Sequence, residues 1–199
     1  KELEDYCHRH LHKSKGKNSN KEVELYRIFY YDCPPMEKKI YHPLLKRQVD
    51  FSKTELYTWS IAFFEELKKK RKFALRMGKL ADGQAHYTLK EKVLRALCNG
   101  KIKFEDLTEQ DFYISVDQKG VDMKIGIDIA SLAYKKQVDQ IVLISGDSDF
   151  VPAAKLARRE GIDFVLDPLG APIKPDLFEH IDGLRSCDKQ YIEHFKKQQ

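Results

Sequence analysis

The sequence predicts an α/β domain built around a mainly parallel sheet, and two observations lead to this fold class. Across residues 123–181, helical and extended patterns alternate, which calls for crossover connections between parallel strands. Within this stretch, residues 140–145 read Gln-Ile-Val-Leu-Ile-Ser, a continuous apolar run typical of the middle of a parallel sheet. We therefore expect residues 140–145 to form an inner strand.

The elements before this stretch follow from shorter patterns. Residues 1–13 carry apolar side chains at helical spacing and read as the end of a helix, followed by a polar loop over residues 14–20. Residues 52–70 predict a long amphipathic helix with an apolar stripe that includes Trp59 and Phe63. Strands are expected at residues 23–31, 73–80 and 112–116, and a short helical or irregular piece at residues 89–98.

The later elements are more regular. Residues 123–136 predict a helix whose buried side includes Ile125 and Ile129. A helix over residues 150–160 is ended by Gly161, which stands where a C-terminal glycine cap is preferred. A strand, a helix and a helical tail are expected at residues 162–166, 173–181 and 191–199.

Composition is that of an ordinary globular protein. The 199 residues fit one large domain, or one domain with an inserted lobe, and 42% of them are hydrophobic. No apolar run approaches the roughly 20 residues of a membrane helix, and no signal peptide opens the chain. Because the chain starts at Lys1 and not at Met, we expect a segment upstream to be absent from it.

Charge and cysteine usage restrict the partners further. The net charge of +5 permits binding to a polyanion without requiring it. The four cysteines lie far apart and form no C-x-x-C pair, which favours reduced thiols in the cytoplasm over a zinc site or a disulfide framework. Three histidines at positions 8, 10 and 12 resemble metal ligands, but their alternate spacing on a helix predicts a solvated face.

The strongest local signal is Ser145-Gly146-Asp147-Ser148-Asp149, directly after the predicted strand over residues 140–145. Ligands of open α/β sheets bind outside the carboxyl ends of the strands, so Asp147 and Asp149 stand where a site is expected. Asp149 could alternatively cap the next helix, whereas Asp147 has no evident capping role. Two adjacent carboxylates repel each other, and Mg²⁺ or Mn²⁺ would relieve this repulsion.

A second acidic signal lies at the start of the helix predicted over residues 123–136. Asp122 follows Lys119-Gly120-Val121, and its alternative role is a favourable interaction with the helix dipole. Asp128 lies between two isoleucines on a half-buried helix, where a carboxylate needs a partner. Six residues correspond to about 120° around a helix, so Asp122 and Asp128 do not share one tight face.

Taken together, these segments resemble the NYN domain, a branch of the PIN-like nucleases. The resemblance is strongest over residues 117–168 and implies a three-layer α/β/α domain that hydrolyses RNA phosphodiesters with Mg²⁺ or Mn²⁺. Under it, Asp122, Asp147 and Asp149 match the acidic site, and Asp128 matches a recurrent acid of the helix. Residues 1–199 then form a single domain, in which residues 34–111 exceed the minimal length and predict a helical insertion.

One feature of the family is missing from the sequence. The family's first strand normally ends in an aspartate, in a segment resembling Ile-Asp-Gly-x-Asn, and no such segment occurs here. Either this strand precedes Lys1, or the chain lacks a metal ligand and is an inactive module that binds nucleic acid or protein. Enzymes of other classes with an Asp-x-Asp strand end, such as Toprim-type enzymes, fit less well, because the earlier glutamate that they need is absent.

The expected partner is RNA, single-stranded or structured, while a homodimer is left open. Substrate contacts should come from residues outside the acids. The basic candidates could alternatively be solvated ends of secondary-structure elements. The nucleic-acid contacts that we expect are Lys119, Ser145, Ser148, Arg76 and Lys79.

Overall fold

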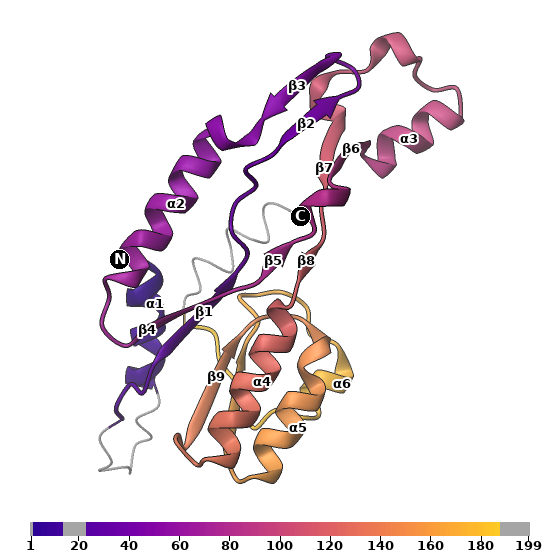
Figure 1. Ribbon diagram of the computed structural model, residues 1–199. Helices are drawn as coiled ribbons and strands as arrows, with labels where there is room; N and C mark the ends of the chain where they lie inside the picture. Colours follow the sequence, from indigo (N-terminus) through magenta and orange to yellow (C-terminus); the bar gives the residue numbers. More distant parts are fainter. Residues whose placement is uncertain (1, 14–22, 188–199) are drawn as a thin grey trace. The chain divides into compact units, whose positions relative to one another are not determined.

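The protein is described by a computed structural model that covers residues 2–13 and 23–187 (Figure 1). It divides into two compact units: unit 1 comprises Lys1–Phe29 and Asp122–Gln199, and unit 2 comprises Tyr30–Val121. Both units contain helices and strands, so the expected mixed α/β class is confirmed. The loop and the tail predicted at residues 14–20 and 191–199 lie outside the described residues.

The sheet of unit 1 has three parallel strands in the described residues, in the order β11-β10-β9. Strand β9 (Gln140–Ile144) pairs with β10 (Asp163–Asp167), with Gln140 opposite Asp163 and Ile144 opposite Asp167. The short strand β11 (Gly183–Leu184) pairs with the other edge of β10. The parallel arrangement was therefore predicted correctly, but the inner strand was not. Among the described strands β10 is inner and β9 is at the edge.

Burial explains this difference between the two strands. Four of the five residues of β10 are buried, whereas β9 has a single buried residue, Leu143. An apolar sequence is compatible with either place in a sheet. What makes β10 the inner strand is β11, a two-residue strand too short to leave a pattern in the sequence.

The described residues of unit 1 include four helices, three of which contain buried apolar side chains. Ile125, Ile129 and Ala133 are buried at helical spacing on one of them, and a second packs on β10. Figure 1 shows α4 and α5 running alongside the sheet. The sheet is small, and the described elements do not form a clear three-layer arrangement. The helices are α1 (Glu2–Lys13), α4 (Val121–Tyr134), α5 (Val151–Arg159) and α6 (Pro175–Phe178).

Gly161 ends α5 as predicted from the sequence. Its φ of 83° lies in the left-handed region, which a glycine adopts at no steric cost. Its N–H donates to the carbonyl of Arg158 at 2.9 Å, and the N–H of Ile162 donates to the carbonyl of Ala157 at 3.0 Å. These two bonds form a Schellman motif, which satisfies the last carbonyls of the helix and directs the chain into β10.

Unit 2 consists mainly of two-stranded pairings and two helices. β2 (Lys39–His42) and β3 (Arg47–Asp50) form an antiparallel pair, and so do β6 (His86–Leu89) and β7 (Phe112–Ser115). The stretch over residues 34–111, expected to be helical, is therefore mixed. Its four-residue strands are too short for the two-residue period of a strand to show in the sequence. The remaining elements are β1 (Ile28–Asp32), paired with β4 (Phe73–Met77), β5 (Lys79–Leu80), paired with β8 (Gln118–Lys119), α2 (Glu55–Lys68) and α3 (Glu91–Cys98).

The long helix of unit 2 begins where its sequence provides a cap. The Thr54 hydroxyl accepts a hydrogen bond from the Tyr57 N–H at 3.2 Å, which satisfies one of the free N–H groups of α2. Phe64 and Leu67 are its buried residues, and α2 packs on β4. Trp59, expected on the apolar stripe, is 61% exposed and stacks on Phe63 instead.

A close backbone approach fixes Gly78 between β4 and β5. Its N–H donates to the carbonyl of Asp32 at 2.7 Å. A Cβ at this position would lie 2.8 Å from the Lys119 carbonyl oxygen and 2.7 Å from a methyl group of Val121. Only a residue without a side chain fits there, because backbone cannot move aside as a flexible side chain can.

Candidate functional site

Residues 145–149, called the acidic loop below, follow β9 in unit 1. The Ser145 N–H donates to the Asp167 carbonyl at 3.0 Å, so the loop begins as a continuation of the β9–β10 pairing. The Ser145 hydroxyl oxygen then accepts from the Asp147 N–H at 3.2 Å, and Asp147 Oδ1 accepts from the Asp149 N–H at 3.0 Å. Consecutive hydrogen bonds thus connect the sheet to both candidate acids of the loop.

The capping roles of the two aspartates are the reverse of those expected. Asp147 caps the short 3₁₀ helix Ser148–Phe150 by an Asx turn, although the sequence suggested no capping role for it. Asp149 lies inside this 3₁₀ helix, and α5 has no side-chain cap. Both aspartates are exposed. Within the described residues, Asp147 Oδ2 and both oxygens of Asp149 accept no hydrogen bond and make no ion pair, so these oxygens are open to a ligand.

Gly146 is explained by a close approach and not by a special turn. Its φ is outside the left-handed region, but a Cβ built on it would lie 3.2 Å from the Cβ of Ala171. A side chain at this position would therefore push the acidic loop away from the segment after β10.

The other two predicted acids lie on α4, in the same unit. Asp122 is exposed in the first turn of the helix, where the helix dipole favours a negative charge. Asp128 is half-buried further along the helix. Unit 1 therefore contains all four aspartates predicted to hold a metal, which are Asp122, Asp128, Asp147 and Asp149.

The basic residues predicted to contact nucleic acid belong to unit 2. Arg76 is half-buried on β4, whereas Lys79 and Lys119 are exposed. Lys79 and Lys119 stand directly opposite each other in the β5–β8 pairing. Like charges in directly opposite positions destabilise a strand pair. A bound anion would remove this repulsion, and so the pair suits a phosphate contact.

A buried polar cluster of unit 1 was not predicted. It is centred on Asp167, the last residue of β10, which is fully buried. Its Oδ2 accepts from the Tyr6 hydroxyl at 2.5 Å and lies 3.0 Å from Nε2 of His10. Its Oδ1 accepts from the Leu169 N–H at 3.0 Å and from the Ser186 hydroxyl at 3.3 Å.

The cluster contains a metal-ligand group that the sequence did not suggest. A ring nitrogen of His10, a carboxylate oxygen of Asp167 and Sγ of Cys187 all lie within 4.8 Å of one another. His10 is 4% exposed, so the solvated face predicted for the three histidines is wrong at this position. Sequence reasoning missed the group because His10 is more than 150 positions from Asp167 and Cys187. The weak signal that was available is Cys7-x-x-His10, whose two side chains share one face of a helix.

Electrostatics in the cluster keep Asp167 charged. Burial acts to raise the pKa of its carboxyl group, but the hydrogen bonds of His10, Tyr6 and the Leu169 N–H outweigh burial and leave the pKa below its ordinary value. Burial, with a smaller contribution from the neighbouring Cys187, raises the pKa of the Cys7 thiol to about 11.

Comparison with known proteins identifies the family. The model of the NYN domain matches residues 61–172, more than half of the chain. The chain belongs to the NYN domain family. This family falls within the PIN-like nuclease superfamily, whose members generally use divalent metals. Nuclease chemistry is thus the activity associated with this family.

Similarity to individual proteins is more limited. An uncharacterized protein, y4oD, from Sinorhizobium fredii (strain NBRC 101917 / NGR234) is 32% identical over 81 residues. The alignment covers 39% of this chain and 38% of the y4oD sequence. No solved structure matches the chain. Among the described residues, no helix combines the length and the apolar character needed to cross a membrane.

The NYN match includes all the acids of one candidate site of unit 1 but only part of the other site. Asp122, Asp147 and Asp149 lie inside the matched residues, as does Asp167. His10 and Cys187 lie outside the match, so the metal-ligand group draws on parts of the chain that the family model does not include.

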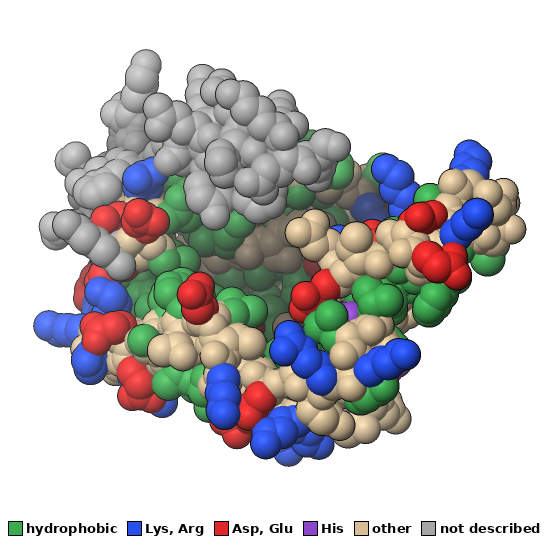
Figure 2. Space-filling view, turned by 90° about the horizontal axis from the view of Figure 1, so that it is seen from above, with side chains coloured by type: hydrophobic (Ala, Val, Ile, Leu, Met, Phe, Trp, Pro, Cys, Tyr) green, Lys and Arg blue, Asp and Glu red, His purple; other side chains and the backbone are tan. Residues whose placement is uncertain are grey.

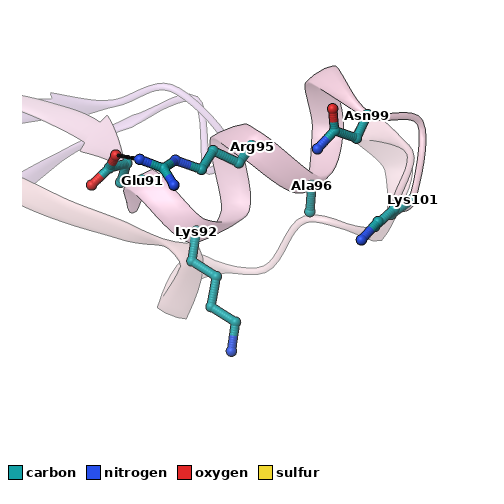
Figure 3. Close-up of a pocket in the computed structure, with 6 residues that line it drawn as sticks. All are labelled: Glu91, Lys92, Arg95, Ala96, Asn99 and Lys101. Atoms are coloured by element: carbon teal, nitrogen blue, oxygen red, sulfur yellow. Dashed lines mark hydrogen bonds and ion pairs between the residues drawn. The ribbon is translucent and has the colours of Figure 1, made fainter.

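The surface offers no stronger alternative to the acidic loop in the described part of the chain. Figure 2 shows a face on which acidic and basic side chains are interspersed, so this face carries no single basic patch. A hollow beside α3 in unit 2 is lined by exposed residues, and its Glu91 and Arg95 form an ion pair (Figure 3). Its lining contains no group of acids or nucleophiles. The lining residues are Glu91, Lys92, Arg95, Ala96, Asn99 and Lys101.

Proposed function

We propose that this NYN protein is a ribonuclease that depends on Mg²⁺ or Mn²⁺. Asp122, Asp147 and Asp149 hold the ion, and Asp128 supports the site from within α4. The observation that carries the proposal is the acidic loop. Two exposed carboxylates stand at the carboxyl end of a parallel strand, where Ser145 bonds to the sheet and local hydrogen bonds connect Ser145 to both aspartates.

The chemistry of the donor atoms fits a hard divalent cation. Carboxylate oxygens are the preferred ligands of Mg²⁺ and Mn²⁺. Among the described residues, three carboxylate oxygens of Asp147 and Asp149 have no hydrogen-bond or ion-pair partner and are open to a ligand. Both side chains are exposed, so a substrate can approach them from solvent. When bound, such a cation neutralises charge on the phosphodiester and promotes ionisation of the attacking water.

The remaining candidate residues bind and orient RNA in this proposal. The opposed Lys79 and Lys119 contact the phosphate backbone, together with Arg76. The Ser145 hydroxyl already accepts a hydrogen bond from the Asp147 N–H, and so its own proton remains available to donate to a phosphate oxygen. Ser148, whose side chain lies outside the described atoms, is assigned the same role.

Domain organisation and cellular setting form part of the same proposal. The NYN match runs across residues 121 and 122, where the two units meet in the sequence. This continuity supports a single domain over residues 1–199. Residues 34–111 stay an insertion in this proposal, although the match includes residues 61–111. The protein would act in the cytoplasm on single-stranded or structured RNA, as a monomer or a homodimer, without a membrane partner.

The test is cleavage of a labelled single-stranded RNA by the full chain. We expect cleavage with Mg²⁺ or Mn²⁺ that stops on addition of EDTA and resumes when the metal is restored. Asp122→Asn and Asp149→Asn should each slow cleavage by about a hundredfold or more, because every ligand lost weakens metal-assisted stabilisation. The circular dichroism signal of the helices should be the same in these variants as in the wild-type chain.

The second candidate function is an inactive NYN module that binds RNA without cutting it. The opposed Lys79 and Lys119 favour RNA binding under either function. Metal-independent RNA binding, in a chain that cleaves no RNA or DNA with any divalent ion, would replace the nuclease proposal by this module. In that case a Lys79→Glu variant should still weaken binding, whereas Asp149→Asn should not.

A further inference from the structure

We propose that unit 1 contains a structural zinc site, formed by Cys7, His10, Asp167 and Cys187. The site is separate from the acidic loop in its ligands and in the metal that it selects, and it does not depend on the nuclease proposal. It would link three parts of unit 1 that are distant in sequence: α1, the carboxyl end of β10 and the segment after β11.

The geometry of the donors is close to that of a zinc centre. Three donor atoms, from His10, Asp167 and Cys187, lie within 4.8 Å of one another. Tetrahedral zinc with bonds of about 2.0–2.3 Å holds its ligand atoms about 3.5 Å apart. The His10 Nε2 to Asp167 Oδ2 distance is 3.0 Å, and the Cys187 sulfur, within 4.8 Å of both, needs to move by only about an ångström.

The charge of the cluster favours a cation. Asp167 is fully buried, and a buried carboxylate needs a compensating charge. No lysine or arginine among the described residues forms an ion pair with Asp167, and His10 compensates its charge only when protonated. A divalent cation would compensate it with His10 in the neutral form that ligates metals.

Cys7 completes the set of four ligands. It stands one helical turn before His10 on α1, so that both side chains project from the same face of the helix. It is half-buried and lies outside the group of three donor atoms within 4.8 Å, so its thiol would move toward the ion on binding. Each thiol that binds the metal loses its proton to solvent, as thiolate ligation requires.

The donor types select zinc over the hard cations of the acidic loop. Two sulfur atoms, one imidazole nitrogen and one carboxylate oxygen suit Zn²⁺, whereas Mg²⁺ prefers oxygen ligands alone. Four protein ligands leave no open position, which is the arrangement of structural rather than catalytic zinc. The hydrogen bond from Tyr6 to Asp167 supplies an outer contact that orients the carboxylate.

The experiment measures metal content and coordination in the full, untagged chain. After dialysis against metal-free buffer, elemental analysis should find about one zinc per chain. Cobalt(II) added to the zinc-stripped protein should give the intense near-ultraviolet absorption of cobalt–thiolate bonds. Cys187→Ser and His10→Asn should lose the zinc and reduce this absorption. Cys98→Ser and His8→Asn are matched controls outside the cluster and should retain both.

Other results would overturn the site. If the folded wild-type chain holds no zinc and gives no cobalt–thiolate absorption, the cluster is a hydrogen-bond network without a metal. If Cys187→Ser keeps zinc as well as Cys98→Ser does, the ion is bound elsewhere. Should Cys187→Ser fail to fold, cobalt titration of the wild-type chain still decides the question. Because RNA cleavage is measured separately with Mg²⁺, failure of the zinc site would leave the nuclease proposal intact.

Discussion

A pair of substitutions at Asp147 separates its two roles, capping and charge. Asp147 Oδ1 accepts from the Asp149 N–H at 3.0 Å, and an asparagine keeps a carbonyl oxygen in the same place while removing the charge. An alanine removes both. A side-chain cap at the start of a helical turn contributes about 1 kcal/mol. We therefore expect Asp147→Ala to lower the free energy of unfolding by about 1 kcal/mol, and Asp147→Asn to leave it nearly unchanged.

Activity should respond differently from stability. If Asp147 holds the metal through its charge, both variants lose several kcal/mol of transition-state stabilisation, which is about a thousandfold in rate. Urea unfolding followed by circular dichroism gives the stability, and initial rates of RNA cleavage in Mg²⁺ give the activity. Asp139→Asn is the matched control. This aspartate is also exposed, but it lies directly before β9, at the end of the strand opposite the acidic loop.

Two results would refute this reasoning. An Asp147→Asn variant that is as unstable as Asp147→Ala would show that the Asx hydrogen bond does not form. An Asp147→Asn variant that cleaves RNA at the wild-type rate would show that the charge is not needed, and the acidic loop would lose its place in the mechanism.

Two further predictions concern the folds of the units. Gly78→Ala should destabilise the chain by about 1–3 kcal/mol, because the new Cβ would overlap a backbone carbonyl, while Gly83→Ala, with nothing within 4 Å, should be nearly neutral in the same thermal unfolding assay. Tyr6→Phe should cost about 1.5–3 kcal/mol in the metal-free chain, since it removes a hydrogen bond to a buried carboxylate. The pKa of Asp167 is lowered in the folded state, so its contribution to stability is present above the ordinary carboxyl pKa and is lost as pH falls through the lowered value. Without the Tyr6 bond the folded pKa lies nearer its ordinary value, so this loss should be smaller and complete at a higher pH; acid unfolding curves that coincide for wild type and variant would contradict the role of Tyr6.

The regular half of the fold could be predicted from the sequence because its signals are local. The start and end of α4, β9, α5 and β10 were placed to within about two residues, since helical periodicity, apolar runs and Gly161 mark them. In contrast, the helix expected over residues 173–181 is a single turn. β11 and the β2–β3 pair were missed, because strands of two to four residues carry too few side chains to show a period.

The candidate sites were predictable to different degrees for a similar reason. The acidic loop is contiguous in sequence, so its position after β9 could be read directly. The capping roles within the loop could not be predicted. The 3₁₀ helix Ser148–Phe150 precedes α5, so the capping residue is Asp147 and not Asp149. The cluster around Asp167 depends on tertiary contacts alone. His10 and Asp167 are 157 positions apart, and no spacing rule connects them.

The hydrogen bond from Ser145 to the carbonyl of Asp167 has a consequence for how the acidic loop moves. This bond extends the β9–β10 ladder beyond the last residue of β9, so the amide of Ser145 should exchange with solvent only when the sheet itself opens. Residues 146–149 are tied down by local bonds alone and can fluctuate about this fixed end. The loop is thus hinged at the sheet, with its first residue as slow as the core and its two carboxylates able to adjust to a ligand on a faster timescale.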